Sequence, residues 1–372
     1  MRMKYSRRLA GILVAISLPA VITGLPFSSA AHADDVIPLP IMGCSPDEIP
    51  MTYLGGERET DGGFIYRFSD QNGIVTTVPQ LPDGLDPANA TDVELELYGF
   101  PTRPTAAADL ADWLHRFAHL HYLPASQPCI SKTVSAAPME TTTYSNIWAG
   151  KELEGPTNSF SLVTGDWVMP QIYTTACQGG ALGQGLTNWV GLSKSGALLQ
   201  DGFNSYGGNN GWYEYAGPGG TSNQVDFGNS GQQPSIYANP GDQVTSYTSY
   251  DSVHFHATFS VANYTQTTAT TPHSVGRGTS YYNGAQAVWI TERPSLTPGG
   301  PQNITQASPV YWTAAIARSA SGTQYGSGGT YPGFINYRIF MQGNSPNSNP
   351  LENPHGWSTT TAFQNNWGGY CN

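Results

Sequence analysis

The chain has 372 residues, long enough for two or three domains. It carries 15 Lys and Arg against 26 Asp and Glu, a net charge of −11, which excludes nucleic-acid binding through clustered basic residues as its main function. Only 11% of residues are charged, whereas 43 Gly, 28 Pro and 12% aromatic residues indicate many turns around a packed interior. This composition favours an all-β protein over a helical or a disordered one.

The first 33 residues are typical of a secretory signal peptide. A basic start over residues 2–8 precedes a mostly apolar stretch over residues 9–25, and Ala31 and Ala33 stand where signal peptidase reads small side chains. We expect cleavage after Ala33 and a secreted, extracellular product. No later segment has about 18 continuous apolar residues, so no membrane association is expected after cleavage. The alternative is an uncleaved anchor.

The chain has four cysteines, and export would allow them to form disulfides. Three pairings are possible, and the absence of a CxxC spacing gives no support to a zinc ribbon or a redox motif. We favour Cys44–Cys129 and Cys177–Cys371, because each pair then stays within one of two regions that differ in charge.

Residues 34–143 form an acidic region with 16 acidic and 5 basic residues. Here Thr91 and Glu94 have the spacing of a capping box at a helix start, and Gly99 can end that helix. Residues 106–121 place apolar side chains at helical spacing, which predicts a second, amphipathic helix.

Residues 144–372 hold only 10 acidic and 6 basic residues and read as strands between turns. Short runs rich in Val, Trp, Tyr, Phe and Thr alternate with Gly, Asn, Pro and Ser clusters; they cover residues 165–169, 189–192, 211–215, 243–247, 254–261 and 287–292. The fold class predicted is a two-sheet antiparallel β-sandwich of the jelly-roll or concanavalin A-like kind, preceded by a small, partly helical region.

Two histidine pairs could in principle hold a metal ion. His115 and His119 would share a face of the second helix, and His254 and His256 would share a face of one strand. The first pair has no HExxH spacing and no acidic ligand placed nearby, and a pair like the second is more often a polar sheet face. We therefore interpret both as polar surface and expect no metal and no cofactor. A pH switch is a further reading of the helical histidines.

Familiar catalytic signatures are missing: the sequence contains no GxSxG, HExxH, Walker loop or aspartic-protease Asp-Thr-Gly. Among the carboxylates after residue 143, Glu214 and Glu292 differ from the rest because they lie within or at the end of aromatic strands. A carboxylate placed beside Trp and Ile is costly unless it has a partner or a task.

Eight short segments resemble, in family order, those of the glutamic peptidases (eqolisins). They cover roughly residues 144–320 and leave residues 34–143 unmatched; they are residues 146–150 (NIWAG), 163–170 (VTGDWVMP), 187–191 (TNWVG), 198–203 (LLQDGF), 211–215 (GWYEY), 239–242 (NPGD), 287–292 (AVWITE) and 306–310 (QASPV).

The resemblance implies an acid-active endopeptidase with a Gln–Glu pair on the concave face of a β-sandwich. By motif, the catalytic residues are Gln200 and Glu292, while Trp189 and Glu214 line or support the site. The mechanism implied is hydrolysis of proteins or peptides by an activated water, without a metal or a covalent intermediate. Three departures put the pH optimum and subsite preference in doubt: Ser193 and Asn204 replace frequent Asp residues, and Val288 replaces a Glu.

The roles implied are chemically sensible. With an ordinary pKa of about 4.3, Glu292 could accept a proton from water near that pH and then return it to the leaving nitrogen. The amide of Gln200 keeps its N–H donor at any pH and could stabilise the oxyanion by about 3–4 kcal/mol. The sparse charge after residue 143 also limits losses of ion pairs in acid.

We expect three segments: the signal peptide (1–33), a propeptide (34–143) that covers the cleft at neutral pH, and the catalytic domain (144–372), which acts as a monomer. The alternative for residues 34–143 is a permanent accessory domain. Two rival functions stay open: a glycoside hydrolase that uses Glu214 and Glu292, and a carbohydrate-binding sandwich without activity.

Overall fold

The computed structural model describes residues 37–44, 48–131, 144–173, 185–194, 197–205, 209–216, 222–227, 236–276, 282–293, 306–342, 350–356 and 360–367. Residues 37–372 make up one unit, which alone is described below. The expected signal peptide lies outside the described residues, so its cleavage stays a prediction. Within the described part of the chain, no helix has the length and apolar character needed to cross a membrane.

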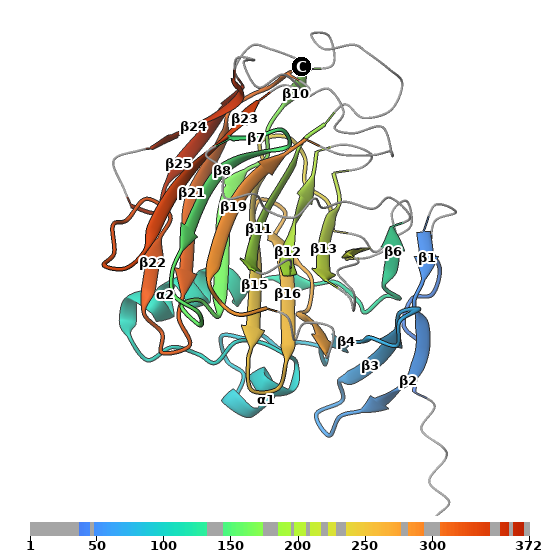
Figure 1. Ribbon diagram of the computed structural model, residues 1–372. Coiled ribbons are helices and arrows are strands. Elements are labelled where there is room, and N and C mark those ends of the chain that lie inside the picture. The colour runs from blue at the N-terminus through green and yellow to red at the C-terminus, as the bar shows by residue number, and fades with distance from the viewer. Residues whose placement is uncertain are drawn as a thin grey trace, which may run out of the picture. The chain divides into compact units, whose positions relative to one another are not determined.

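The unit contains two large antiparallel sheets, and the first of them is shown at the front in Figure 1. In spatial order it consists of β1 (Glu48–Pro50), β6 (Cys129–Ser131), β14 (Ser222–Asp226), β13 (Gly211–Ala216), β12 (Ala197–Asn204), β11 (Thr187–Lys194), β19 (Gln286–Glu292), β8 (Trp148–Glu154) and β23 (Ile335–Gln342).

The second sheet has the spatial order β2 (Thr52–Arg58), β3 (Phe64–Ser69), β4 (Val75–Gln80), β18 (His273–Gly276), β16 (His256–Asn263), β15 (Gln243–Asp251), β9 (Leu162–Val168), β21 (Val310–Arg318), β25 (Phe363–Trp367) and β24 (Pro350–Gly356). Shorter strands complete the fold: β5 (His121–Tyr122), β7 (Tyr144–Ser145), β10 (Ile172–Tyr173), β17 (Thr268–Ala269), β20 (Gln306–Ala307) and β22 (Gln324–Gly326).

The core lies between the two sheets, where β11 and β12 pack over β9, β15 and β16. Side chains alternate between the two faces of a strand, so one set from each sheet points inward. The inward set is strongly apolar and aromatic, and it includes Val190, Leu199, Tyr213, Trp289 and Trp312. The predicted β-sandwich is confirmed.

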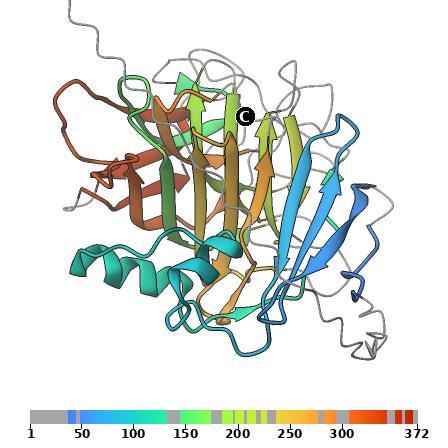
Figure 2. The same ribbon diagram turned by 90° about the horizontal axis from the view of Figure 1, so that it is seen from below.

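Two helices lie beside the second sheet (Figures 1 and 2). α1 (Asp92–Leu97) begins with the predicted capping box of Thr91 and Glu94, and Gly99 follows its end with a φ of 75°. α2 (Ala107–Phe117) buries Trp113 and Phe117 in one cluster with Tyr247. Tyr247 alternates with inward-facing neighbours on β15, so α2 covers the outer face of the second sheet.

Two local predictions are wrong. α2 ends at Phe117 because Ala118 is extended and His119 has a φ of 60°, so His115 and His119 do not share a helix face. Asp86 holds the turn by accepting the backbone N–H of His119 and contacting its Nδ1 at 2.6 Å.

The other wrong prediction concerns the start of β16. This strand begins at His256, while His254 lies in the preceding turn and contacts Asp251, so the two histidines are not partners on one strand. Phe255, between the two histidines, is exposed with a φ of 56°.

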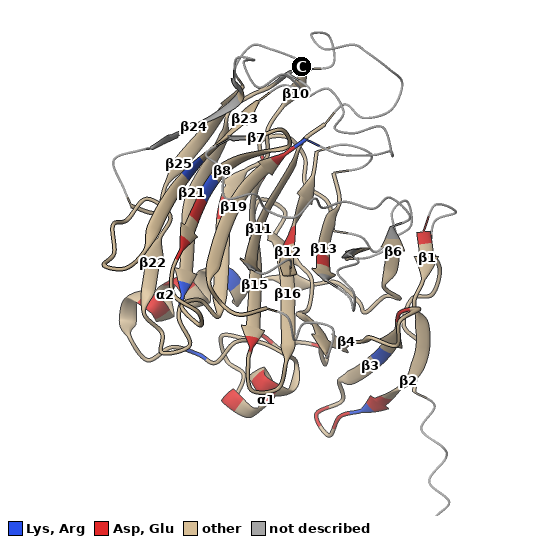
Figure 3. Cartoon of the chain, in the orientation of Figure 1, with Lys and Arg blue, Asp and Glu red and all other residues tan. Residues whose placement is uncertain are grey.

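The disulfide Cys44–Cys129 is present, as predicted, and it closes most of the N-terminal region into a loop. Cys177 and Cys371 lie outside the described residues, so their pairing stays a prediction. Charged residues are sparse along the strands of both sheets, in agreement with the composition (Figure 3).

Candidate active site

The register of three neighbouring strands brings the predicted residues to one face of the first sheet. On β11, Thr187, Trp189 and a glycine, Gly191, follow one another at every second position and therefore share a face. Gln200 on β12 lies opposite Gly191, and Glu292 on β19 lies opposite Thr187. Gln200, Trp189 and Glu292 therefore share a face, which we call the site face.

The site face is the outer face of the first sheet. Residues at the alternate positions, such as Val190, Leu199 and Trp289, belong to the core between the sheets. The site face has an apolar cluster of its own, formed by Ile147, Trp148, Trp189, Leu198, Trp212, Val288, Ile290 and Ile339. The polar side chains of the site are therefore surrounded by large apolar groups.

Small residues make room for the indole of Trp189. Gly202 lies directly opposite Trp189, and a Cβ at this position would come within 2.7 Å of the Trp189 Cα and 2.1 Å of the Asn188 carbonyl oxygen. A Cβ at Gly191 would come within 3.2 Å of the Gln200 Cβ. The two glycines thus allow Trp189 and Gln200 to pack side by side.

Glu292 is buried and bonded to Trp189. The indole Nε1–H donates to Oε2 of Glu292 at 2.7 Å. Burial raises the pKa of Glu292 to about 8; the hydrogen bond from Trp189 lowers it, and the charge of Glu214 raises it. The carboxyl therefore carries a proton throughout the acid range.

This raised pKa corrects the expectation of an ordinary carboxylate that titrates near pH 4.3. The apolar surroundings disfavour the ionised form more than the indole N–H groups of Trp189 and Trp148 favour it. A carboxyl group in this state can offer an O–H donor and a carbonyl acceptor at the same time.

Gln200 is buried and is oriented by Glu214. Its Nε2 donates to Oε2 of Glu214 at 2.8 Å, and the two residues lie opposite each other on β12 and β13. A carboxamide has two N–H donors, and in the part of the chain that the structure describes only one of them has an acceptor. Oε1 of Gln200 has no hydrogen-bond partner among the described residues. One donor and one acceptor of this amide are therefore free to bind a reacting group.

Gln200 and Glu214 lie on one side of β11, and Glu292 lies on the other side. Gln200 is opposite Gly191 and Glu292 is opposite Thr187, so the two are offset by four residues along β11. At about 3.3 Å a residue, the offset is roughly 13 Å between the backbones. The charge of Glu214 nevertheless contributes to the pKa of Glu292, so the two pairs lie within electrostatic reach of each other. Polar groups from four neighbouring strands, β13, β12, β11 and β19, thus form one constellation.

Two tryptophans that sequence reasoning did not select line the site face. Trp148 on β8 lies opposite Glu292 and packs edge-on against Trp189, with ring centroids 5.2 Å apart. Trp212 on β13 lies opposite Gly202. Both occur within the quoted motifs, but only the strand register shows that they face the site.

The three departures from the family pattern also lie on the site face. Asn204 accepts a hydrogen bond from the Thr187 hydroxyl at 3.0 Å, and Val288 lies opposite Gly191. Ser193 is buried near the end of β11. At these positions the face carries neutral groups, which leaves Glu214 and Glu292 as the carboxyls linked to Gln200 and Trp189.

Metal-ligand residue types come together once among the described residues, at Cys44, Glu48 and Cys129. The two cysteines form the disulfide, so their thiolates are not available as ligands.

Comparisons with known proteins identify a family for this chain. A family model described as the Peptidase A4 family matches residues 146–339. No curated protein matches the chain. Similar solved structures include scytalido-glutamic peptidase with a peptide-based transition-state analogue (18% identity, TM-score 0.41) and with a transition-state analogue inhibitor (18%, 0.44). They also include SCP-B, an eqolisin-family peptidase, with the tripeptide Ala-Ile-His (17%, 0.39). Each alignment covers 60% of this chain and 98% of the other. Because the family model matches just over half of its length, the chain belongs to the Peptidase A4 family.

Proposed function

We propose that this peptidase is a secreted, acid-active endopeptidase in which Gln200 and Glu292 carry the chemistry. The observation that carries the proposal is the buried Glu292 bonded to Trp189, on the face that also holds Gln200 with one free N–H. Membership of a peptidase family favours peptide bonds as the substrate over the polysaccharides of both rival functions.

In the proposed first step, water attacks the scissile carbonyl carbon. The carbonyl oxygen of the protonated Glu292 carboxyl takes a proton from the water as the water oxygen forms its bond to carbon. The carboxyl O–H gives its own proton to the substrate oxygen, so the carboxyl ends the step still protonated. The free N–H of Gln200 donates to the same substrate oxygen while negative charge develops on it, and Oε1 of Gln200 accepts from the water.

In the second step the tetrahedral intermediate breaks down. Glu292 donates a proton to the leaving nitrogen and takes one back from a hydroxyl of the intermediate, while the C–N bond breaks. The products are a carboxylic acid and an amine, and the enzyme returns to its starting state. Glu292 acts as base and as acid in each step, and a protonated resting form suits work at low pH.

Glu214 and Trp189 have supporting roles in this proposal. Glu214 fixes one N–H of Gln200, which directs the other toward the substrate. Trp189 fixes Oε2 of Glu292 and excludes water beside it. No step requires a metal ion or an organic cofactor.

The test is cleavage of denatured casein between about pH 3 and 5, with a panel of polysaccharides as the alternative substrates. We expect casein cleavage, reduced by about 10²–10³ in Gln200→Ala and about 10²–10⁴ in Glu292→Gln. The matched controls Gln243→Ala and Glu57→Gln change exposed residues away from the site face and should keep full activity. Casein cleavage that survives both site variants would reject the assignment.

A further inference from the structure

We propose that residues 37–131 stay in the working enzyme as part of its catalytic unit, and that Asp70 in this region positions the strand that carries Glu214. This replaces the propeptide expected from the sequence. The role of Asp70 rests on the site proposed above, whereas retention of the region does not.

The N-terminal region extends both sheets of the sandwich. β4 pairs with β18 at Thr76–Val275 and Thr77–Ser274, which adds β2–β4 to the edge of the second sheet. β6 pairs with β14, which adds β6 and β1 to the edge of the first sheet. In Figure 2 the blue strands continue a sheet of the sandwich. Removal of the region would leave β14 and β18 as unpaired edges.

The two regions also share one apolar core. A single buried cluster contains Val190, Tyr213 and Trp289 of the sandwich together with N-terminal side chains, namely Met51, Tyr66, Phe68, Ile74, Val78, Ala125 and Ile130. A removable segment that contributes this many core side chains would expose a large apolar surface on leaving. The shared core therefore favours retention.

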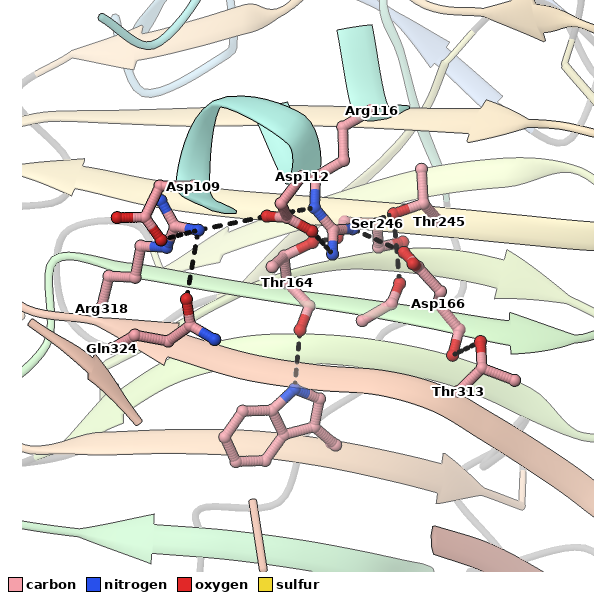
Figure 4. Close-up of polar contacts among 12 residues, drawn as sticks. Asp109, Asp112, Arg116, Thr164, Asp166, Thr245, Ser246, Thr313, Arg318 and Gln324 are labelled. Atoms are coloured by element: carbon pink, nitrogen blue, oxygen red, sulfur yellow. Dashed lines mark hydrogen bonds and ion pairs between the residues drawn. The ribbon is translucent and has the colours of Figure 1, made fainter. Parts of the chain in front are cut away.

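Polar contacts fasten α2 to the second sheet (Figure 4). The buried guanidinium of Arg116 donates to Asp166 on β9 and to the Thr245 hydroxyl on β15. Arg318 on β21 contacts Asp109 and Asp112 of α2 in return. Arg116 of the N-terminal region thus binds a carboxylate of the sandwich, and Arg318 of the sandwich binds two carboxylates of the N-terminal region. These contacts lie on the outer face of the second sheet, away from the site face.

A carboxyl pair joins the two regions at the first sheet. Asp226 on β14 hydrogen-bonds to Glu48 on β1, and burial, followed by this neighbour, raises the pKa of Asp226 well above its usual range. Asp226 in its protonated form can donate to Glu48, so acid does not release this contact at the pH where the peptidase is expected to work.

Asp70 reaches the site strand directly. Its Oδ1 accepts the backbone N–H groups of Asn72 and Ile74, both at 2.8 Å, which fixes the carboxyl in the β3–β4 turn. Its Oδ2 accepts the Tyr215 hydroxyl and the Asn223 Nδ2, both at 3.1 Å. Tyr215 is the neighbour of Glu214 on β13 and points to the core between the sheets. Asp70 therefore contacts β13 on the face opposite the site face.

The first experiment determines what the active species contains. The full chain is purified by gel filtration at the assay pH, and the peak that cleaves casein is unfolded and analysed by peptide mass spectrometry. We expect peptides from residues 37–131 and 144–372 in equal amounts, whether or not the connection between them has been cut. Activity in a peak that lacks residues 37–131 would overturn the proposal. This measurement tests retention of the region independently of the catalytic residues. Activity that persists in Glu292→Gln would contradict only the proposed chemistry.

The second experiment tests Asp70 as a positioning residue. In Asp70→Asn the turn keeps its acceptor, but an N–H₂ group replaces the acceptor that faces Asn223. We expect kcat to fall about tenfold, with KM changed by less than about twofold and the protein still folded at the assay temperature. The matched control Asp86→Asn changes a turn carboxylate that contacts His119 instead and should keep kcat within about twofold.

Two combinations separate positioning from a general loss of stability. Asp70→Asn with Asn223→Asp restores a donor–acceptor pair of reversed polarity and should recover most of kcat. In a Glu214→Gln background, Asp70→Asn should cause no further loss, because its effect passes through that residue. A full multiplicative loss in that background, or equal effects of Asp70→Asn and Asp86→Asn, would reject the role of Asp70.

Discussion

Replacement of Trp189 by Phe tests the electrostatics of the site most sharply, because it keeps an aromatic ring and removes one hydrogen bond. The Nε1–H of Trp189 donates to Glu292 at 2.7 Å in a buried setting. A hydrogen bond to an ionised group contributes about 1.5–3 kcal/mol, and one to a neutral group about 0.5–1.5 kcal/mol. The bond therefore favours the ionised form by about 1.4 kcal/mol, which corresponds to about one pH unit.

The direction of the expected shift in the pH dependence of kcat/KM follows from the proposed chemistry, in which Glu292 must be protonated. In the native enzyme kcat/KM for an unstructured peptide should be flat in acid and fall as the pH rises through about 8, the pKa of Glu292. Trp189→Phe should raise that pKa and move the alkaline limb up by about one unit.

The control is Trp212→Phe, which removes an indole N–H on the same face that has no hydrogen-bond partner among the described residues. Its rate can change, but its alkaline limb should not move. A limb that stays in place in Trp189→Phe, moves downward, or moves equally in both variants would refute the reasoning.

Three further outcomes are expected. Burial, the largest influence in each case, raises the pKa of Glu292 to about 8 and the pKa values of Asp201 and Asp226 well above the usual range. The stability that these three protonated carboxyls contribute is therefore present in acid and is lost as the pH rises through their folded-state pKa values. The melting temperature should therefore be at least ~5 °C higher at pH 4 than at pH 8, and calorimetry that finds the reverse would contradict this reading. Arg116→Met leaves Asp166 buried without its cation and should lower the free energy of unfolding in urea by about 3–5 kcal/mol, most of which Asp166→Asn in the same chain should restore; an unchanged denaturation midpoint would show that the pair is not closed in solution. Gly202→Ala places a Cβ against the backbone of residues 188 and 189 and should cost several-fold in kcat together with about 1–3 kcal/mol of stability, whereas wild-type kinetics and melting would show that the strands are not packed as described.

The strands, the capping box and the Cys44–Cys129 pair were predictable because each depends on local pattern or on a choice among few options. The site face was predictable in part: the motifs select Gln200, Trp189, Glu214 and Glu292, but their common face follows from the register of β11 with both neighbours. No sequence pattern reports register between strands that are far apart in the chain.

Three features could not be read from the sequence for physical reasons. The pKa of Glu292 depends on burial by side chains from several strands. The end of α2 depends on Asp86, 33 residues before His119, which holds a left-handed turn. The union of residues 37–131 with the sandwich depends on strand pairing across more than 90 residues, and it makes Asp70 a neighbour of β13 although nothing in its local sequence marks it.

The most direct measurement is a structure of the folded Glu292→Gln variant with an uncleaved peptide bound. The account predicts that the scissile carbonyl lies on the site face, within hydrogen-bond reach of both the Gln200 amide and the side chain at position 292. A peptide bound on another surface, or a scissile bond that only one of these two side chains can reach, would contradict it.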